Sequence, residues 1–361
     1  MRHASLLLIA AFAVLAAGAA VHSFTGRNTS QGVPRQMVEA FALWQSKHAK
    51  LYASPAEQGH SLRVFSDQTS FIGQKNAEYE AHAAKAGVTL SGPAHEMNMF
   101  GDLSNEEFKV MYTGAMQYDE EYMPQEIVSE ERRKELEEIS KENISTVKQS
   151  LGQGWYPRIR SQGSCGSCWA FSAIPEIERI LFNSLKGQNI DLSQQELVDC
   201  VQESHGCFGG HPEHAFNYIK NFGIHKASAY PYITNRGSCR GNMGGKITIY
   251  NLANSAFQPF DHNKAQRASN ERIQAVVMVK AEGAFRYQAN NDDIYDVKWS
   301  NECGEGISHG VSMYEFNGGV ANIVNSWGNN WGRNGMKRIR ACGLDNLWGT
   351  NGRIAYPYSF F

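Results

Sequence analysis

No cysteine occurs before Cys165, whereas all seven cysteines of the 361-residue chain lie between Cys165 and Cys342. In an oxidising compartment an odd number of cysteines leaves one thiol unpaired, and spacing alone does not select among the many possible pairings of the others. The uneven distribution predicts two units, a first half without disulfides and a second half that disulfides hold together.

An excess of charge of one sign is also absent. The formal net charge is -2, which gives no indication of a nucleic-acid partner or of binding to an anionic membrane. Long apolar runs are absent after residue 21, so no later segment is predicted to span a bilayer.

The N-terminus has the layout of a cleaved secretory signal peptide, predicted at residues 1–20. An almost wholly apolar run, Ser5 to Val21, follows Arg2 and closes on small residues. A membrane anchor is the alternative, but the run is short and lacks a Lys or Arg stop. We expect the chain to enter the secretory pathway, to reach a lysosome or the cell exterior without a stable membrane anchor, and to carry glycans at Asn28 and Asn143.

Helical periodicity dominates residues 37–85, where Pro55 separates two expected helices. Ser104 and Glu107 have the spacing of a capping box for a third, short helix. From Asp119 to Glu142 the chain has ten acidic and four basic residues and few apolar ones. This composition is typical of an exposed connector that a protease can cut.

The second half changes from helical to strand patterns. Helices are expected from Cys168, from Ser193, where Glu196 would complete a capping box, and over residues 215–222. Strands are expected between glycine-rich turns at 275–279, 311–316, 321–325 and 336–340. A helical part followed by an antiparallel sheet part predicts an α+β fold with a cleft between the two parts.

A nucleophilic thiol is predicted where a loop becomes a helix, at Cys168. The helix dipole favours negative charge there and lowers the pKa of a thiol. Such a nucleophile also needs a base and a group that orients the base. His309 stands at the start of one predicted strand and Asn325 at the end of the next, so pairing of the strands would bring them together. Taken alone, each of these residue types is more often structural.

The segment Gln162 to Ser172 resembles, nearly residue for residue, the active-site segment of the papain-like cysteine proteases. The run Asn325-Ser326-Trp327-Gly328 is similar to the second signature of that family, and His309 lies between them at the family's spacing. The resemblance implies a papain-like two-part fold, with a helical part and a β-barrel-like antiparallel part, and a zymogen nearer the cathepsin L type than the cathepsin B type.

The resemblance also implies a role for each residue at the site. Cys168 would be the nucleophile, His309 the general base, and Asn325 the group that holds the imidazole, with Trp327 covering their hydrogen bond. The Gln162 amide and the Cys168 backbone N–H would bind the oxyanion. The reaction would be acyl transfer through a thioester. Asn325 rather than an Asp would suit the orienting position, because a thiolate–imidazolium pair needs no third full charge.

Three disulfides are implied by the resemblance: Cys165–Cys207, Cys200–Cys239 and Cys303–Cys342, which leaves Cys168 free. An alternative interpretation takes Cys165 and Cys168 as a redox dithiol or half of a zinc site. No thioredoxin-like pattern surrounds them and no second paired-cysteine motif is present, so we expect neither a metal nor a cofactor.

Substrate contacts follow from the same resemblance. Gly209 and Gly210 would pair with an extended peptide, and the S2 pocket would favour an apolar P2 side chain. The residues implied around S2 are His211, Pro212, Gly310 and Leu347. The spacing from Asn325 to Cys342 is shorter than usual in the family.

The first half resembles the inhibitory propeptide of the family, expected at residues 24–118. Its interrupted helical motif is matched by Glu57, Phe65, Ile72 and Asn76, with Ser61 and Gln68 in place of the usual Arg and Asn. A second motif is matched by Asn98, Phe100 and Asp102, with Glu96 in place of a Gly. The acidic connector would span 119–150, and its carboxylates are hypothesised to weaken docking as pH falls. The peptidase domain would span 151–361.

The predicted function is a cysteine endopeptidase made as a zymogen. Its partners would be polypeptide substrates, its own propeptide and cystatin-like inhibitors. The alternative function is a catalytically silent homologue that binds peptides or acts as an inhibitor.

Overall fold

The computed structural model describes residues 32–114, 155, 157–249, 258–259, 265–266, 269–270, 274–300, 308–340 and 353–355. Several predicted features lie outside the described residues: the signal peptide, the acidic connector, and the single positions Asn28, Asn143, Cys303, Cys342 and Leu347. The chain separates into two units, residues 1–60 and residues 61–361.

The first unit holds helix α1 (Arg35–Lys47) and the start of α2 (Pro55–Lys85), as the periodicity predicted. Pro55 is the first residue of α2, where its missing N–H would have no partner in any case. The Ser54 hydroxyl accepts from the Glu57 backbone N–H, and the Glu57 carboxylate accepts from the Ala53 N–H. Glu57, predicted as a motif residue of the propeptide, therefore caps the beginning of this helix.

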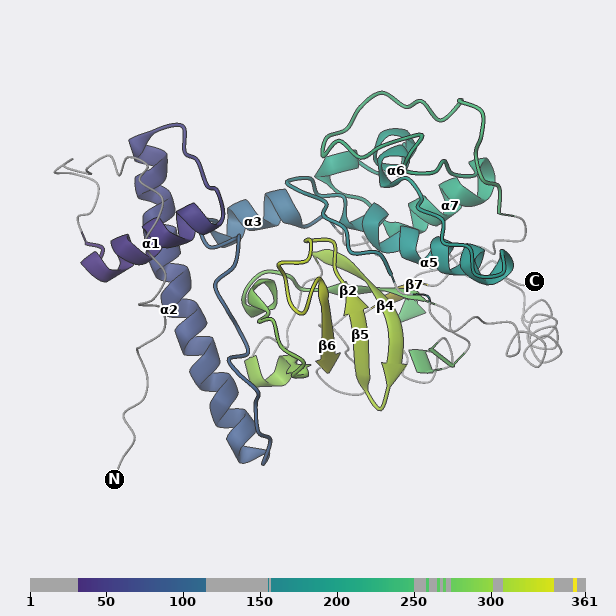
Figure 1. Cartoon of the computed structure of the whole chain (residues 1–361). Helices are drawn as coiled ribbons and strands as arrows, with labels where there is room; N and C mark the ends of the chain where they lie inside the picture. Colours follow the sequence, from purple (N-terminus) through teal and green to yellow (C-terminus); the bar gives the residue numbers. More distant parts are fainter. Residues whose placement is uncertain are drawn as a thin grey trace. The chain divides into compact units, whose positions relative to one another are not determined.

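In the second unit the chain continues through α2 into α3 (Asn105–Tyr112) and then into three helices around Cys168. These are α5 (Cys168–Ser184), α6 (Gln194–Cys200) and α7 (Pro212–Phe222) (Figure 1). The predicted capping box at α3 is present: the Ser104 side chain accepts from the Glu107 N–H, and the Glu107 side chain accepts from the Ser104 N–H. Short 3-10 helices lie at Gly206–Phe208, Ala284–Tyr287 and Val297–Ser300.

Seven described strands form one sheet in the order β1-β7-β2-β4-β5-β6-β3. The strands are β1 (Gln258–Pro259), β2 (Ala275–Val279), β3 (Tyr295–Asp296), β4 (His309–Asn317), β5 (Val320–Val324), β6 (Met336–Arg340) and β7 (Arg353–Ala355). All described pairs are antiparallel except β3 with β6. Figure 1 shows β2, β4, β5 and β6 side by side. The predicted α+β class is confirmed.

Strand β2 separates two apolar cores. Ala275, Val277 and Val279 belong to a core beneath the sheet, whereas Val276 and Met278 belong to a core that they share with α5, α6 and α7. Successive side chains of a strand point to opposite faces, so a strand with every residue buried must contribute to both cores. The sheet is thus covered by the helices on one face, and the element with His309, β4, pairs directly with β2.

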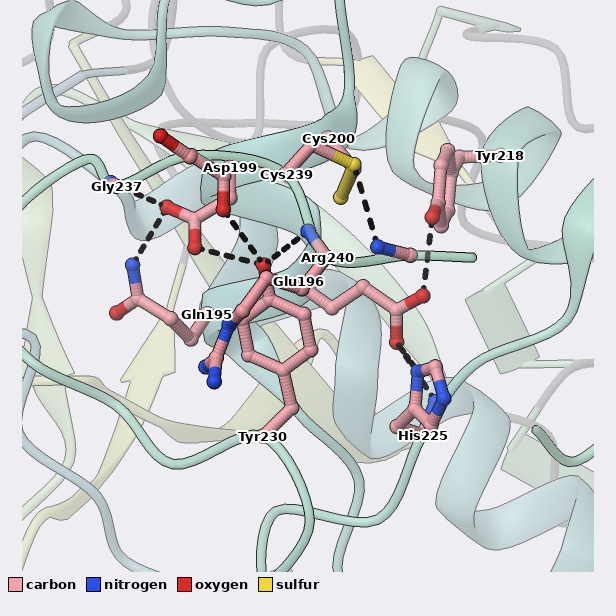
Figure 2. The surroundings of a disulfide bond; sticks show 12 residues. Gln195, Glu196, Asp199, Cys200, Tyr218, His225, Tyr230, Gly237, Cys239 and Arg240 are labelled. Atoms are coloured by element: carbon pink, nitrogen blue, oxygen red, sulfur yellow. Dashed lines mark hydrogen bonds and ion pairs between the residues drawn. A yellow bond between two sulfur atoms is a disulfide. The ribbon is translucent and has the colours of Figure 1, made fainter. Parts of the chain in front are cut away.

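The predicted capping box at α6 is only half present. The Ser193 hydroxyl accepts from the Glu196 N–H, but the Glu196 carboxylate does not return to the backbone N–H of Ser193. It is fully buried and accepts from the His225 backbone N–H at 2.7 Å and from the Tyr218 hydroxyl at 3.0 Å, with Lys246 Nζ at 2.8 Å. Glu196 points away from the cap because these buried donors bind its carboxylate (Figure 2). The spacing of residues in the sequence did not predict these contacts.

We predict that Glu196→Ala destabilises the fold by about 3–5 kcal/mol, because it leaves the buried His225 donor and Lys246 without their acceptor. Urea unfolding of a Cys168→Ala chain, which cannot digest itself, measures this loss. Glu203→Ala is the matched control, since the Glu203 side chain is exposed, and it should change stability by less than about 0.5 kcal/mol. Equal effects of both substitutions would contradict the prediction.

Candidate functional site

Cys168 is the first residue of α5 and is fully buried. The loop before it is held by a disulfide between Cys165 and Cys207, and by the Gly166 N–H, which donates to the Cys207 carbonyl at 2.8 Å. Because Cys165 is bonded to Cys207, it provides no thiol for the alternative dithiol or zinc site. A second disulfide joins Cys200 to Cys239 (Figure 2), and Cys168 is a free cysteine.

His309 begins β4 and Asn325 directly follows β5, the strand paired with β4. The predicted pairing of these strands is therefore present, and it places His309 Nε2 2.8 Å from Asn325 Oδ1. The other ring nitrogen, Nδ1, is buried without a hydrogen-bond partner. The indole of Trp327 stacks on the imidazole with ring centroids 4.5 Å apart, which shields the His309–Asn325 bond from water.

Gln162 reaches the site because its backbone pairs with the segment after β5. Its N–H donates to the Ser326 carbonyl at 2.8 Å, and the Ser326 hydroxyl donates to its side-chain oxygen at 2.5 Å. The side-chain nitrogen donates to the carbonyls of Cys165 and Tyr112 at 2.8 and 3.2 Å. Ser326 thus fixes which end of the Gln162 amide faces the site. Sequence analysis missed this role, although Ser326 stands inside the second signature.

The segment Tyr112 to Gly114 runs through the same site. The Gly114 N–H donates to the Ser308 carbonyl at 2.9 Å, and the Gly114 carbonyl accepts from the Gly210 N–H at 2.8 Å. Thr113 is buried, and the Tyr112 carbonyl accepts from the Gln162 amide and from the Trp327 indole N–H. The predicted substrate-binding backbone at Gly210 is therefore occupied by the chain itself.

The other predicted substrate contacts are neighbours of Gly210 and Ser308, the two residues that hydrogen-bond to Gly114. Gly209 has φ 117°, a left-handed backbone that favours glycine. His211 and Pro212 are buried at the start of α7. Gly310 follows His309 in β4, where an added Cβ would meet the Ser172 hydroxyl at 2.9 Å.

Among the described residues no three or more His, Cys, Asp or Glu side chains are placed to hold a metal ion. Within the same described ranges, no helix combines the length and the apolar character that a bilayer crossing requires.

A model of the papain family cysteine proteases matches residues 147–356 of the chain. The chain belongs to the papain family of cysteine proteases. A model of the cathepsin propeptide inhibitor domain (I29) matches residues 41–108. This papain-family protease is therefore a zymogen that carries its own inhibitory propeptide.

The chain is similar to known proteins of this family over most of its own length and of theirs. Caricain from Carica papaya is 32% identical over 309 residues, which are 82% of this chain and 79% of caricain. Papain from the same plant is 29% identical over 327 residues, 90% of this chain and 87% of papain. The structure of digestive procathepsin L 3 from the larval midgut of Tenebrio molitor has a TM-score of 0.64 and 26% identity, covering 90% of this chain and 100% of that one.

The propeptide docks on the peptidase through aromatic residues that surround Trp327. Phe100 and Phe108 lie 5.4 and 5.2 Å from the Trp327 ring, and both are fully buried. The guanidinium of Arg286, also buried, donates to the Leu103 and Ser104 carbonyls and lies over the Phe108 ring. The indole that covers His309 is thereby also the centre of the propeptide contact.

Residues of both propeptide motifs form a second contact with the peptidase, Asn98 directly and Asn76 through His95. Asn98 Nδ2 donates to the Arg286 carbonyl at 2.6 Å. Asn76 holds the backbone of His95 on both sides: it donates to the His95 carbonyl and accepts from the His95 N–H, each at 2.9 Å. His95 pairs as a β-bridge with Gln288 of the peptidase and is 1% exposed. The motif residues thus position His95 inside the contact.

Burial by the propeptide changes the protonation of the site. Burial raises the pKa of Cys168 to about 12, against nearby backbone N–H groups that favour the thiolate. Burial also lowers the pKa of His309 to about 4, and the Asn325 hydrogen bond acts in the opposite direction. The zymogen therefore holds a neutral thiol and a neutral imidazole. Burial of the site raises the pKa of the Cys168 thiol by more than the helix terminus was expected to lower it.

We predict that Gly114→Ala loosens the propeptide over Cys168, because an added methyl group would overlap the Gly166 carbonyl. Overpacking of this kind costs roughly 1–3 kcal/mol, so the Cys168 thiol of the unprocessed zymogen should react with iodoacetamide at pH 7 about tenfold faster or more. Gly73→Ala is the control, since a Cβ at Gly73 in α2 meets nothing within 4 Å. Equal alkylation rates in the two variants would contradict the prediction.

Proposed function

We propose that the processed protein is a cysteine endopeptidase in which Cys168 attacks the peptide carbonyl and His309 serves as the general base. The support is the geometry around the imidazole: Nε2 is held by Asn325, and Nδ1 has no hydrogen-bond partner and remains available for the thiol proton. Release of the propeptide admits water and substrate, so the desolvation that keeps both groups neutral is relieved. The thiolate and the imidazolium then form together.

The reaction proceeds by acyl transfer in two steps. The Cys168 sulfur bonds to the carbonyl carbon, the oxyanion is bound by the Gln162 amide and the Cys168 N–H, and the imidazolium gives its proton to the departing amine. Water then attacks the thioester with His309 as base, and the acid product leaves. The contact between Gln162 Nε2 and the Tyr112 carbonyl supports this role, because the same N–H already holds a carbonyl oxygen at this place.

The propeptide blocks this reaction because its Tyr112 to Gly114 segment takes the hydrogen-bond partners of a substrate. The chain boundaries proposed are a signal peptide at 1–20, the propeptide at 24–118, a cleaved connector at 119–150 and the peptidase at 151–361. Secretion or lysosomal delivery, glycans at Asn28 and Asn143, the bridge between Cys303 and Cys342, and inhibition by cystatin-like proteins belong to the same proposal.

Specificity is proposed to depend on the P2 side chain of the substrate. His211, Pro212, Gly310 and Leu347 would surround S2, and an apolar side chain would bind there. The buried side chain of Met278, which would lie 3.6 Å from a Cβ at Gly310, gives this part of the sheet an apolar surface and supports the preference.

A peptide epoxide that reacts only with activated thiols tests the function and the specificity together. After acid processing, we expect a reagent with Leu at P2 to label Cys168, and one with Arg at P2 to label it at least about tenfold more slowly. His309→Ala should abolish labelling by both, since no base then takes the thiol proton. Absence of labelling in the wild type, with His309 and Asn325 intact, would support the silent homologue instead.

A second prediction concerns acid processing and follows from His95. Burial, and next the charge of Lys337, lower the pKa of His95 to about 3 in the docked propeptide. A released propeptide has an ordinary His pKa near 6.5, so docking keeps its full strength above that value and weakens as pH falls, by up to roughly tenfold per pH unit. The connector carboxylates, which lie outside the described residues, remain a separate prediction.

His95→Phe keeps a ring between Tyr79 and Tyr295 but removes the titration. We expect the ratio of zymogen processing rates at pH 5 and pH 7 to fall about tenfold in this variant, consistent with the loss of one titrating group. His82→Phe, near the end of α2 and half-exposed, is the control and should keep the wild-type ratio. The same ratio in all three proteins would remove His95 from the acid response.

A further inference from the structure

A buried carboxyl group lies in the seam between the helix of the nucleophile and the strand of the base. Glu176 is in α5, two turns after Cys168, and is 1% exposed. Ser312 is in β4, three residues after His309, and its hydroxyl lies 2.9 Å from Glu176 Oε1. The same hydroxyl lies 3.1 Å from Oε1 of Gln274, which directly precedes β2. These three side chains connect α5, β4 and the start of β2.

The number of hydrogens decides the protonation state of Glu176. The Ser312 hydroxyl has one hydrogen but faces two acceptor oxygens, so both contacts are hydrogen bonds only if Glu176 supplies a proton of its own. The acid then donates to Ser312 Oγ, and Ser312 donates to Gln274. Turning the Gln274 amide over would satisfy Ser312, but an ionised Glu176 would then have a single donor and an Oε2 without any.

In the part of the chain that the structure describes, no charged group forms an ion pair with Glu176. Burial raises the pKa of Glu176 well above its ordinary value, and the Ser312 hydrogen bond opposes the shift only in part. Among the described residues, several charged groups on the surrounding elements have other partners. Glu178 pairs with Arg160, Arg179 lies over Trp155, and Glu315 accepts from Asn322. The charged and titratable groups of α5, β4 and the adjoining cavity are Arg158, Arg160, Glu178, Arg179, His309 and Glu315. Arg158 and Arg160 line the cavity with Ser312, but Glu176 pairs with neither, since its Oε1 contacts Ser312 and its Oε2 has no hydrogen-bond partner.

The seam continues from this group to the proposed catalytic residues. A small cavity is lined by Ser172 and Pro175 of α5, by Gly310 and Ser312 of β4, and by Asn325. A shift of α5 against β4 would therefore alter the distance between the thiol and the imidazole. Ser312 pairs with Val324 in the register of β4 and β5, one residue before Asn325.

We propose that Glu176 is a neutral carboxylic acid that clamps the Cys168 helix to the His309 strand, and that loss of its proton releases this clamp and sets an upper pH limit on the folded, active enzyme. Glu176 is a positioning residue in this proposal, since it acts through Ser312. The sign follows from linkage: the folded state binds a proton that the unfolded state gives up above about pH 4.5, so stability falls as pH rises beyond that value.

Glu176→Gln tests the proposal, because an amide has the shape of the protonated acid and donates to Ser312 at every pH. Thermal unfolding is measured from pH 4.5 to pH 8 in the full chain with Cys168→Ala. We expect the Tm of Glu176→Gln minus that of the parent to increase as pH rises. Glu315→Gln is the matched control: Glu315 lies on the same strand as Ser312 but is exposed, so its curve should run parallel to that of the parent. Parallel curves for Glu176→Gln and the parent would overturn the proposal.

Infrared spectroscopy gives a second test that does not require the variant to fold. The parent chain at pH 6 should show the carbonyl stretch of a buried protonated carboxylic acid, and this band should disappear together with the fold as pH is raised. A band that disappears while the fold persists, or no such band at pH 6, would contradict the clamp. Where Glu176→Gln folds, the band should be missing from its spectrum.

The consequence for activity rests on the proposed protease function, whereas the thermal and infrared tests do not. In processed enzyme, the ratio of kcat/KM at pH 7.5 to that at pH 5 should rise about threefold or more in Glu176→Gln, in line with removal of one ionisation. The change should appear in kcat rather than KM, because the buried Glu176 side chain does not contact substrate. An unchanged ratio with a confirmed thermal effect would limit Glu176 to a role in stability.

Discussion

The stacking of Trp327 on His309 is the contact on which both states of the molecule depend. One face of the indole keeps water from the His309–Asn325 bond. Its edge and its N–H meet Phe100, Phe108 and the Tyr112 carbonyl of the propeptide. The propeptide therefore docks on the same ring that stacks on His309. A substitution at Trp327 cannot weaken inhibition without also exposing the imidazole.

Desolvation connects inhibition with chemistry. A thiolate–imidazolium pair is stabilised by water at its edges, by the helix terminus and by backbone N–H groups, and the zymogen removes the first of these. Both groups are fully buried beneath the propeptide and are neutral there. The propeptide thus acts on the site in two ways: its backbone takes hydrogen-bond partners that are proposed for a substrate, and it keeps water from the Cys168 thiol, which stays neutral.

Local patterns in the sequence predicted much of the fold and of the site. The periodicity at residues 37–85, the cap at Ser104 and the strand that begins with His309 all depend on neighbouring residues, and they are present as predicted. The propeptide segment in the site, the role of Ser326 and the fate of Glu196 depend on residues far apart in the chain. The spacing of residues along the sequence does not predict such contacts, because they form only when the tertiary structure brings distant segments together.

Two buried ionisable groups, one a base and the other an acid, make the molecule respond to pH in the same direction. His95 is buried neutral as a base, so acid opposes the docked propeptide. Glu176 is buried neutral as an acid, so alkali opposes the fold that aligns Cys168 with His309. The charge of Lys337 adds to the effect of burial on the pKa of His95, and the Glu176 carboxyl group contacts the Ser312 hydroxyl. Both terms therefore favour the open, active protease at acidic pH. A carboxylate and a histidine placed in reverse positions would favour the inhibited zymogen there instead.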